Sequence, residues 1–151
     1  MLVYRICKSA YASDLSGTGA RLVGGRWNSK GIPVVYTSGT RSLAVLEILV
    51  HIPAAMVPKD FMIVSIFIPD NIGIDEISWK QVKPEIDKLG THANFAKMGN
   101  EWVMKMSSVV LKVPSIVVKD EFNYIINPMH PKSKEIKIAE QKPFSFDARL
   151  F

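Results

Sequence analysis

Short apolar segments rich in β-branched residues recur along this chain of 151 residues and constrain its fold more than any other feature. Strands are expected at residues 2–7, 32–37, 61–68, 109–113, 115–118, 124–126, 135–139 and 144–151. Helical periodicity is confined to residues 41–51 and 94–106, with shorter helical pieces expected around Pro84. Strands joined by tight turns as well as by helices predict an α+β domain with a mixed or mostly antiparallel sheet and a few helices.

No internal repeat, low-complexity tract or linker divides the sequence, so residues 1–151 are expected to form a compact single domain. At this length about two-thirds of the surface of the unfolded chain can be buried, which is enough for a core without metals or disulfides. Cys7 is the one cysteine, and the three histidines are scattered. The sequence therefore predicts neither a disulfide scaffold nor a metal site.

The most apolar stretch, residues 43–57, is interrupted by Glu47 and Pro53, so we do not expect it to cross a bilayer. Near the N-terminus, Arg5 and Lys8 fall where a signal peptide would need an uninterrupted apolar run. We therefore expect a cytoplasmic protein with no membrane partner.

The net charge of +5 arises in the N-terminal part of the chain. Residues 1–59 carry seven basic and two acidic side chains, whereas the remainder carries twelve of each. Four of the five arginines precede residue 42, and the planar fork of arginine suits bidentate binding of phosphate or carboxylate. This asymmetry favours an anionic ligand near the N-terminal segment, and the alternative is a basic excess that only aids solubility.

Residues 13–31 contain five glycines and show no regular periodicity, which is typical of a long functional loop. Within it, Gly24 and Gly25 would let backbone N–H groups approach an anion, Arg26 would add a fork of donors, and Trp27 would offer a stacking face. These residues predict a binding nest for a diphosphate, although the glycines fit neither the P-loop nor the dinucleotide fingerprint. The alternative is a plain turn whose tryptophan packs in the core.

A carboxylate falls on the apolar face predicted for helix 41–51. Leu43, Leu46 and Val50 are expected to share a stripe, and Glu47 lies on it. Because burying an unpaired carboxylate costs several kcal/mol, such a residue needs a partner or a task. One task is to stabilise positive charge on a substrate, as carboxylates do during glycosidic bond cleavage. The alternative is a solvated glutamate at the edge of the stripe, paired with a basic neighbour.

Three further polar residues stand at the ends of predicted strands. Tyr36 ends the strand between the glycine loop and the helix, so it could share a cleft with Arg26 and Glu47; core packing is its alternative role. Neighbouring prolines place Ser115 and Asn127 at strand boundaries, where polar side chains can line a pocket or cap a turn. Ser115 has no partners of a Ser-His-Asp arrangement, so we expect it to form hydrogen bonds rather than act as a nucleophile.

Four blocks of the sequence, taken in order, resemble the RES domain family, which is named for its Arg, Glu and Ser. The blocks are GTGARLVGGRWNSKGIPVVYTS (17–38), LAVLEILVH (43–51), VPS (113–115) and NYIINPMHP (123–131). The family residues correspond to Arg26, Glu47 and Ser115. Residues 70–100 contain nothing that matches.

The resemblance implies a fold similar to the ADP-ribosyltransferase toxins and the role of toxin in a bacterial type II toxin–antitoxin system. Family members deplete NAD by phosphorolysis or hydrolysis at the nicotinamide–ribose bond, and some relatives transfer ADP-ribose to a protein. NAD would thus be a substrate rather than a cofactor, inorganic phosphate or water would be the acceptor, and no metal would be needed. The partner would be an antitoxin with a helix-turn-helix DNA-binding part, in a homo- or hetero-oligomer.

The resemblance also implies roles for individual residues. The expected catalytic residues are Arg26, Tyr36 and Glu47. The expected substrate-binding residues are Arg5, Gly25, Trp27, Ser115 and Asn127. The two arginines would bind the NAD phosphates, the tyrosine would position the nicotinamide riboside, the glutamate would stabilise the ribosyl cation, and the serine and asparagine would hold the ribose or phosphate. Two alternatives to NAD depletion are ADP-ribosylation of a protein and a non-enzymatic module that binds nucleic acid. Neither NAD depletion nor ADP-ribosylation is expected to involve direct contact with nucleic acid.

Overall fold

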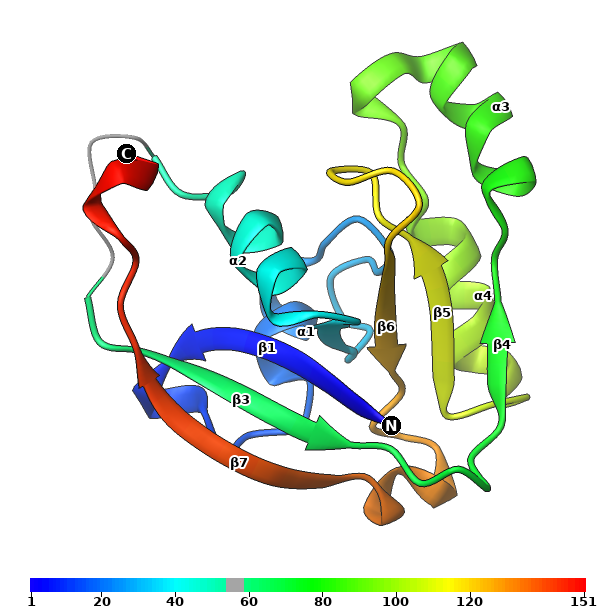
Figure 1. Ribbon diagram of the computed structural model, residues 1–151. Helices are drawn as coiled ribbons and strands as arrows, with labels where there is room; N and C mark the ends of the chain where they lie inside the picture. The colour runs from blue at the N-terminus through cyan, green and yellow to red at the C-terminus, as the bar shows by residue number, and fades with distance from the viewer. Residues whose placement is uncertain (54–58) are drawn as a thin grey trace.

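A computed structural model describes residues 1–53 and 59–151 (Figure 1). Within these ranges the chain forms seven strands and four α-helices. The strands are β1 (Leu2–Lys8), β2 (Val35–Ser38), β3 (Phe61–Phe67), β4 (Ile74–Glu76), β5 (Val110–Pro114), β6 (Phe122–Ile126) and β7 (Lys137–Phe144). The helices are α1 (Thr18–Val23), α2 (Arg41–Leu49), α3 (Trp79–Leu89) and α4 (Ala96–Lys105). The predicted α+β class is confirmed.

The strands form one mixed sheet in the order β4-β5-β6-β2-β1-β3-β7. The β4–β5 pair is parallel, and every other neighbouring pair is antiparallel. β1 and β3 pair along seven residues, whereas β1 and β2 meet at the single register pair of Tyr4 and Ser38. The sheet therefore divides between β1 and β2 into two halves that run in different directions (Figure 1).

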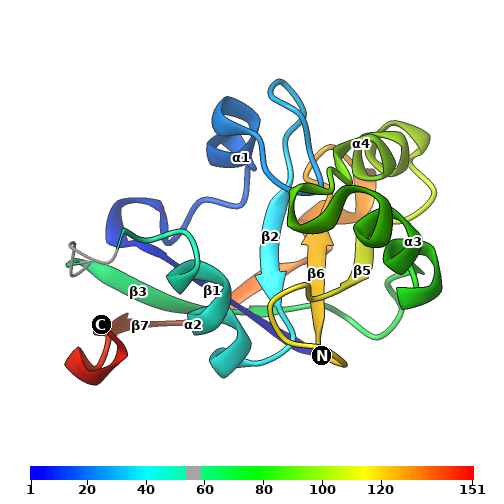
Figure 2. The same cartoon turned by 90° about the horizontal axis from the view of Figure 1, so that it is seen from above.

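The helices are distributed between these two halves. Seen from above, α2 lies over β1, while α3 and α4 lie beside β5 and β6 (Figure 2). Ala44 of α2 packs against Ile6 of β1 in one buried cluster. Trp27 and Val34 pack with Phe95 and other residues of the α3–α4 region against Val113 in a second cluster. No helix among the residues that the structure describes is long and apolar enough to cross a membrane.

Most of the predicted elements are present, but the glycine-rich segment is not simply a loop. It contains α1, which lies between Gly17 and Gly24, both with positive φ (+73° and +76°). These are backbone conformations that glycine adopts without a steric penalty. A helix of six residues is too short for an apolar periodicity to reveal it.

Two of the strands predicted near the C-terminus, 115–118 and 144–151, are wrong. Residues 115–118 form a turn because the Ser115 hydroxyl accepts the backbone N–H groups of Val117 and Val118, an alternative to the hydrogen bonds of a strand. Instead of separate strands at 135–139 and 144–151, a single edge strand pairs with β3 across a bulge. Pro143 is tolerated in it because an edge strand leaves one row of N–H groups unpaired.

Candidate active site

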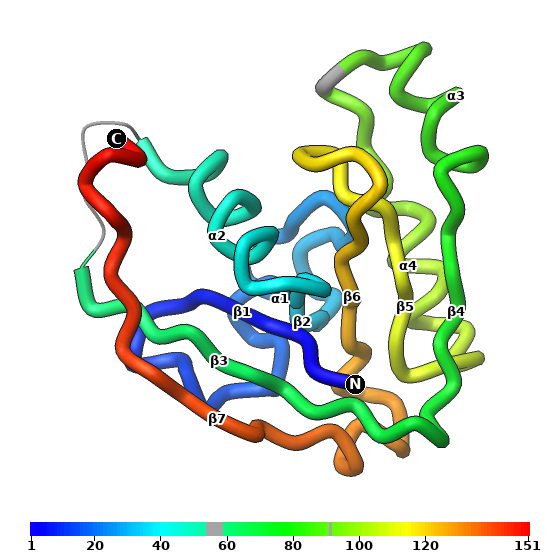
Figure 3. The backbone as a smooth tube through the Cα atoms, in the orientation of Figure 1, coloured from blue at the N-terminus to red at the C-terminus, as the bar shows by residue number. Residues whose placement is uncertain are grey.

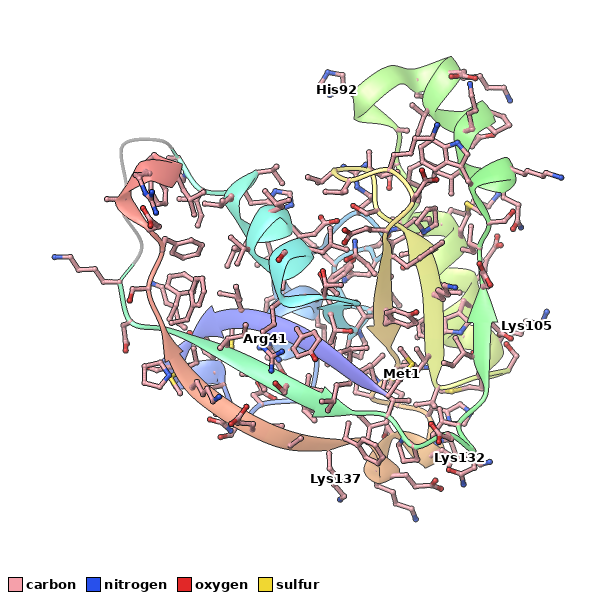
Figure 4. The ribbon with its side chains drawn as sticks, in the orientation of Figure 1. Met1, Arg41, His92, Lys105, Lys132 and Lys137 are labelled. Atoms are coloured by element: carbon pink, nitrogen blue, oxygen red, sulfur yellow. The ribbon has the colours of Figure 1, made fainter. Side chains whose placement is uncertain are left out.

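A cleft of about 780 Å³ opens where β1 and β2 separate. β1 and β2 form its floor, α2 and the glycine loop form two walls, and the segment after α3 and the loop between β5 and β6 complete the rim. In Figure 3, α2 (cyan) lies next to the loop between β5 and β6 (yellow). His92 projects from the segment after α3 over the open side (Figure 4). The volume falls within the usual range of small-molecule sites.

Glu47 projects into this cleft from α2, whose N-terminus is capped by the Thr40 hydroxyl. Its Oε1 accepts two hydrogen bonds, from Ser115 Oγ at 2.7 Å and from Asn123 Nδ2 at 2.6 Å. Within residues 1–53 and 59–151 no group donates to Oε2. One carboxylate oxygen is therefore fixed by the protein, and the other is available to a ligand.

The apolar stripe predicted for α2 is only partly correct. Leu43 is buried, but Leu46 and Val50 are 40% and 57% exposed. The buried residues of the helix are instead Leu43 and Ala44, because one side of α2 packs on β1 and the other side borders the cleft. Glu47 is consequently half-buried with polar partners rather than surrounded by the core.

Two arginines also line the cleft. Arg5, on β1, donates from Nη1 to the carbonyl oxygen of Asp14 at 2.7 Å and from Nη2 to that of Tyr11 at 3.4 Å. Arg26 is exposed, and no carboxylate in the described part of the chain forms a salt bridge with either guanidinium. The cleft therefore carries positive charge that no internal ion pair compensates.

The predicted backbone nest at the glycine pair does not form. The N–H of Gly24 donates to the carbonyl oxygen of Ala20 at 2.7 Å, and the N–H of Gly25 donates to that of Asn28 at 3.0 Å. The first bond ends α1 and the second closes the turn, so neither donor is free to hold a phosphate. Gly25 is needed for a different reason: a Cβ atom there would lie 2.7 Å from the hydroxyl oxygen of Tyr36.

Asn28 organises this turn, although no sequence pattern pointed to it. Its buried side-chain amide donates to the carbonyl oxygens of Ala20 and Ile32, each at 2.9 Å, and its Oδ1 accepts the hydroxyl of Tyr36 at 2.6 Å. The same hydroxyl accepts the N–H of Trp27 at 3.0 Å. Burial raises the pKa of Tyr36 to about 12. Tyr36 lines the cleft as a neutral side chain whose hydroxyl proton is already engaged.

Trp27 borders the cleft, but its ring is packed in the core. Its side chain is 3% exposed and stacks on Phe95, with ring centroids 4.9 Å apart and an interplanar angle of 20°. The ring face predicted to stack on a substrate is therefore packed against another aromatic ring. The alternative role, a turn whose tryptophan packs in the core, is the one that the structure shows.

Ser115 and Asn127, both predicted to bind substrate, are buried and are not among the residues that line the cleft. Ser115 uses its hydroxyl to hold Glu47 in place. Asn127 follows β6 at the far end from the cleft, where Nδ2 donates to the carbonyl oxygen of Val103 at 3.1 Å and Oδ1 accepts the N–H of Met129 at 3.0 Å. In both cases the buried polar residue at a strand boundary forms hydrogen bonds within the protein.

The residue of β6 that does reach the cleft is Asn123, which was not among the predicted site residues. Its one sequence signal is a polar residue at the start of an apolar strand. Its importance depends on the register that places it opposite Ser38. His51 and His92, on opposite rims, were likewise not assigned to the site.

Comparison with known proteins identifies the family of this chain. The sequence model of the RES domain matches residues 2–147. A "Toxin Res" of Photorhabdus laumondii is 39% identical, covering 99% of this chain and 97% of that protein. A "Prs ADP-ribosylating toxin" of Sphingobium sp. is 35% identical, covering 92% and 88%.

The fold is also similar to a solved structure. A chain in the crystal structure of the M. tuberculosis MbcT–MbcA toxin–antitoxin complex superposes with a TM-score of 0.73 at 16% identity, covering 95% of this chain and 84% of that one. This likeness shows a shared fold. With a family model that spans nearly the whole sequence, the resemblance noted from the motifs is confirmed, and the chain belongs to the RES domain family.

Proposed function

We propose that this protein is the toxin of a toxin–antitoxin pair and that it depletes NAD by cleaving the nicotinamide–ribose bond. The observation that carries the proposal is Glu47: its Oε1 is held by two donors, and its Oε2 is available in the same cleft as Arg5 and Arg26. A fixed carboxylate facing uncompensated positive charge suits a substrate that combines an anionic diphosphate with a cation-like reacting centre.

The arginines account for binding of the diphosphate. Arg5 is anchored through carbonyl oxygens, so its positive charge is not neutralised by those contacts. Arg26 stands exposed at the rim. Guanidinium groups bind phosphate oxygens through charge-assisted hydrogen bonds, and two of them in one cleft match the two charges of the NAD diphosphate.

Glu47 accounts for the chemistry. When the bond between C1′ of the ribose and the nicotinamide nitrogen breaks, both bonding electrons leave with nicotinamide, which departs neutral. The positive charge passes to the ribosyl group, and the carboxylate stabilises it. An oxygen of water or inorganic phosphate then bonds to C1′, and water releases its extra proton to solvent. Because the leaving group is neutral, the step needs neither a metal nor a general acid.

The comparisons support the biological role. Two relatives that match nearly the whole chain are called toxins, and the similar solved fold comes from a toxin–antitoxin complex. On this basis the partner of the present chain is an antitoxin, and the family resemblance adds that this antitoxin carries a helix-turn-helix DNA-binding part. The NAD consumed would be that of the cytoplasm.

The test is direct. The purified protein is mixed with NAD, and free nicotinamide is measured by liquid chromatography with and without inorganic phosphate. Release that requires phosphate identifies phosphorolysis, and release in its absence identifies hydrolysis. Glu47→Gln serves as the inactive control. If nicotinamide is not released under either condition, the proposal is wrong.

A second candidate is transfer of ADP-ribose to a protein. It is favoured by the relative called a Prs ADP-ribosylating toxin, which is 35% identical. The same cleavage of NAD would take place, but a nucleophilic side chain of the target would bond to C1′. NAD labelled in its adenylate part separates the two candidates, because only transfer leaves the label on protein after denaturation.

A further inference from the structure

We propose that Asn123 is a positioning residue that decides which oxygen of Glu47 meets the substrate, and that Ser38 holds Asn123 in the required orientation. The effect of this positioning on catalysis rests on the proposed function. The hydrogen-bond directions from which it is argued are properties of the protein itself, and they can be tested without NAD.

The sheet brings these residues together. Ser38 of β2 and Asn123 of β6 are register partners, so their side chains project from the same face. Ser38 Oγ lies 2.8 Å from Asn123 Oδ1, and Asn123 Nδ2 lies 2.6 Å from Glu47 Oε1. Ser38, Asn123 and Glu47 all line the cleft. These contacts therefore connect Ser38, where β1 and β2 meet, with the carboxylate of Glu47.

The direction of each hydrogen bond to Glu47 is forced. The amide nitrogen of Asn123 can only donate. The hydroxyl of Ser115 already accepts the N–H groups of Val117 and Val118, at 3.1 and 3.0 Å, so its own proton points to Glu47. Oε1 thus accepts from two donors and has no room for a proton. Oε2 is the oxygen left to face the ribosyl group.

The reverse orientation of the Asn123 amide is unfavourable. It would place Oδ1 against Oε1 of Glu47, so that two acceptors would meet at a hydrogen-bond distance. Ser38 is buried, and its hydroxyl donates to Oδ1 in the observed orientation. Because a hydroxyl can donate or accept, Ser38 supports the orientation less strongly than Glu47 does.

Two substitutions distinguish positioning from packing. Asn123→Asp keeps the size of the side chain but replaces the donor with a carboxylate oxygen, whereas Asn123→Ala only removes the donor. Positioning predicts that Asp is worse than Ala: kcat for nicotinamide release falls about tenfold in the alanine variant and about a hundredfold in the aspartate variant. In the alanine variant the Kd for NAD changes less than about threefold. Packing predicts the opposite order.

Controls separate orientation from charge. Asn71→Asp places the same negative charge on an exposed turn outside the cleft and leaves kcat unchanged. Ser38→Ala lowers kcat less than Asn123→Ala does. If the aspartate variant of Asn123 is at least as active as the alanine variant, or if Ser38→Ala is the more damaging change, the proposal is overturned.

Thermal unfolding tests the same directions without substrate. Asn123→Asp is expected to lower Tm more than Asn123→Ala. In a Glu47→Gln background this extra loss becomes smaller, because the charge repulsion between the two carboxylates is removed. An extra loss that is undiminished in that background, or that never appears, overturns the proposal. Absence of nicotinamide release from the wild-type protein would instead overturn the proposed function, and the Tm comparison would still decide the role of Asn123.

Discussion

Ser115 donates a hydrogen bond to the carboxylate of Glu47, 68 positions earlier in the chain, with an Oγ–Oε1 distance of 2.7 Å. The serine is oriented by its own turn, because its hydroxyl also accepts the N–H groups of Val117 and Val118. The conformation of the loop between β5 and β6 is thereby coupled to the carboxylate on α2. Glu47 and Ser115, which the resemblance matches to two of the three residues that name the family, thus act as one unit.

Glu47→Gln is expected to lower kcat for nicotinamide release by about a hundredfold or more, because it removes the negative charge that stabilises the ribosyl cation. NAD binding and Tm should change little. The glutamine oxygen can still accept from Ser115 and Asn123. Chromatographic assay of nicotinamide and calorimetric titration of NAD measure the two effects. Turnover close to wild type in the folded variant contradicts the role.

Arg26→Ala is expected to weaken NAD binding about tenfold or more, which is the usual effect of losing a hydrogen bond to a charged group. Arg26→Lys should not restore affinity, since an ammonium does not reproduce a bidentate fork. Arg21→Ala, an exposed arginine outside the cleft, is the matched control. Affinities from titration calorimetry decide the question. A lysine variant that binds like wild type would show that Arg26 supplies charge alone.

Gly25→Ala is expected to destabilise the fold by about 1–3 kcal/mol, because the added Cβ would meet the hydroxyl of Tyr36 at 2.7 Å. Gly19→Ala is the contrasting control: it lies in α1, where a Cβ meets nothing within 4 Å, and alanine favours helix by up to about 1 kcal/mol. Urea unfolding measures both changes. Equal stability of the two variants contradicts the account of this turn.

The stability of the protein should depend on Tyr36 at high pH. Burial raises the pKa of Tyr36 from 10.0 to about 12, so the unfolded chain releases this proton first. The contribution is therefore fully present below about pH 10 and is lost as the pH rises from 10 to about 12. Tyr36→Phe should flatten the fall of Tm over this interval, whereas Tyr11→Phe, an exposed phenol, should not. Parallel Tm profiles for the Tyr36→Phe variant and the wild type are the contrary result.

Expression of the chain alone should arrest bacterial growth, because loss of NAD stops metabolism. Glu47→Gln should relieve the arrest, and so should co-expression of a cognate antitoxin. The positive cleft suggests that an acidic or carboxylate-bearing segment of the partner covers Arg5 and Arg26. Titration of a non-hydrolysable NAD analogue tests this point: equal affinity for the free toxin and for the complex would show that the site is not covered.

Local sequence patterns were enough to establish the fold class and to find residues that share the cleft, among them Arg26, Tyr36 and Glu47. Apolar strands of three to eight residues, separated by two helical runs, were sufficient for the α+β class because period and length are local properties. Only 21 residues of chain, with one strand and one short helix, connect Arg26 through Tyr36 to Glu47. Because the connection is so short, the three residues lie at one site. The motifs around them also identified the RES domain family.

The roles of several of these residues depend instead on contacts between distant parts of the chain. The N–H groups of Gly24 and Gly25 donate to backbone carbonyl oxygens, Trp27 packs on Phe95, and Ser115 holds Glu47. Whether a polar group is free for a ligand depends on which donor or acceptor lies within hydrogen-bond distance. That distance is set by strand register and by the way α2 crosses β1, across separations of many residues. Asn123 shows this clearly: its role follows from standing opposite Ser38, a pairing across 85 residues that no local pattern encodes.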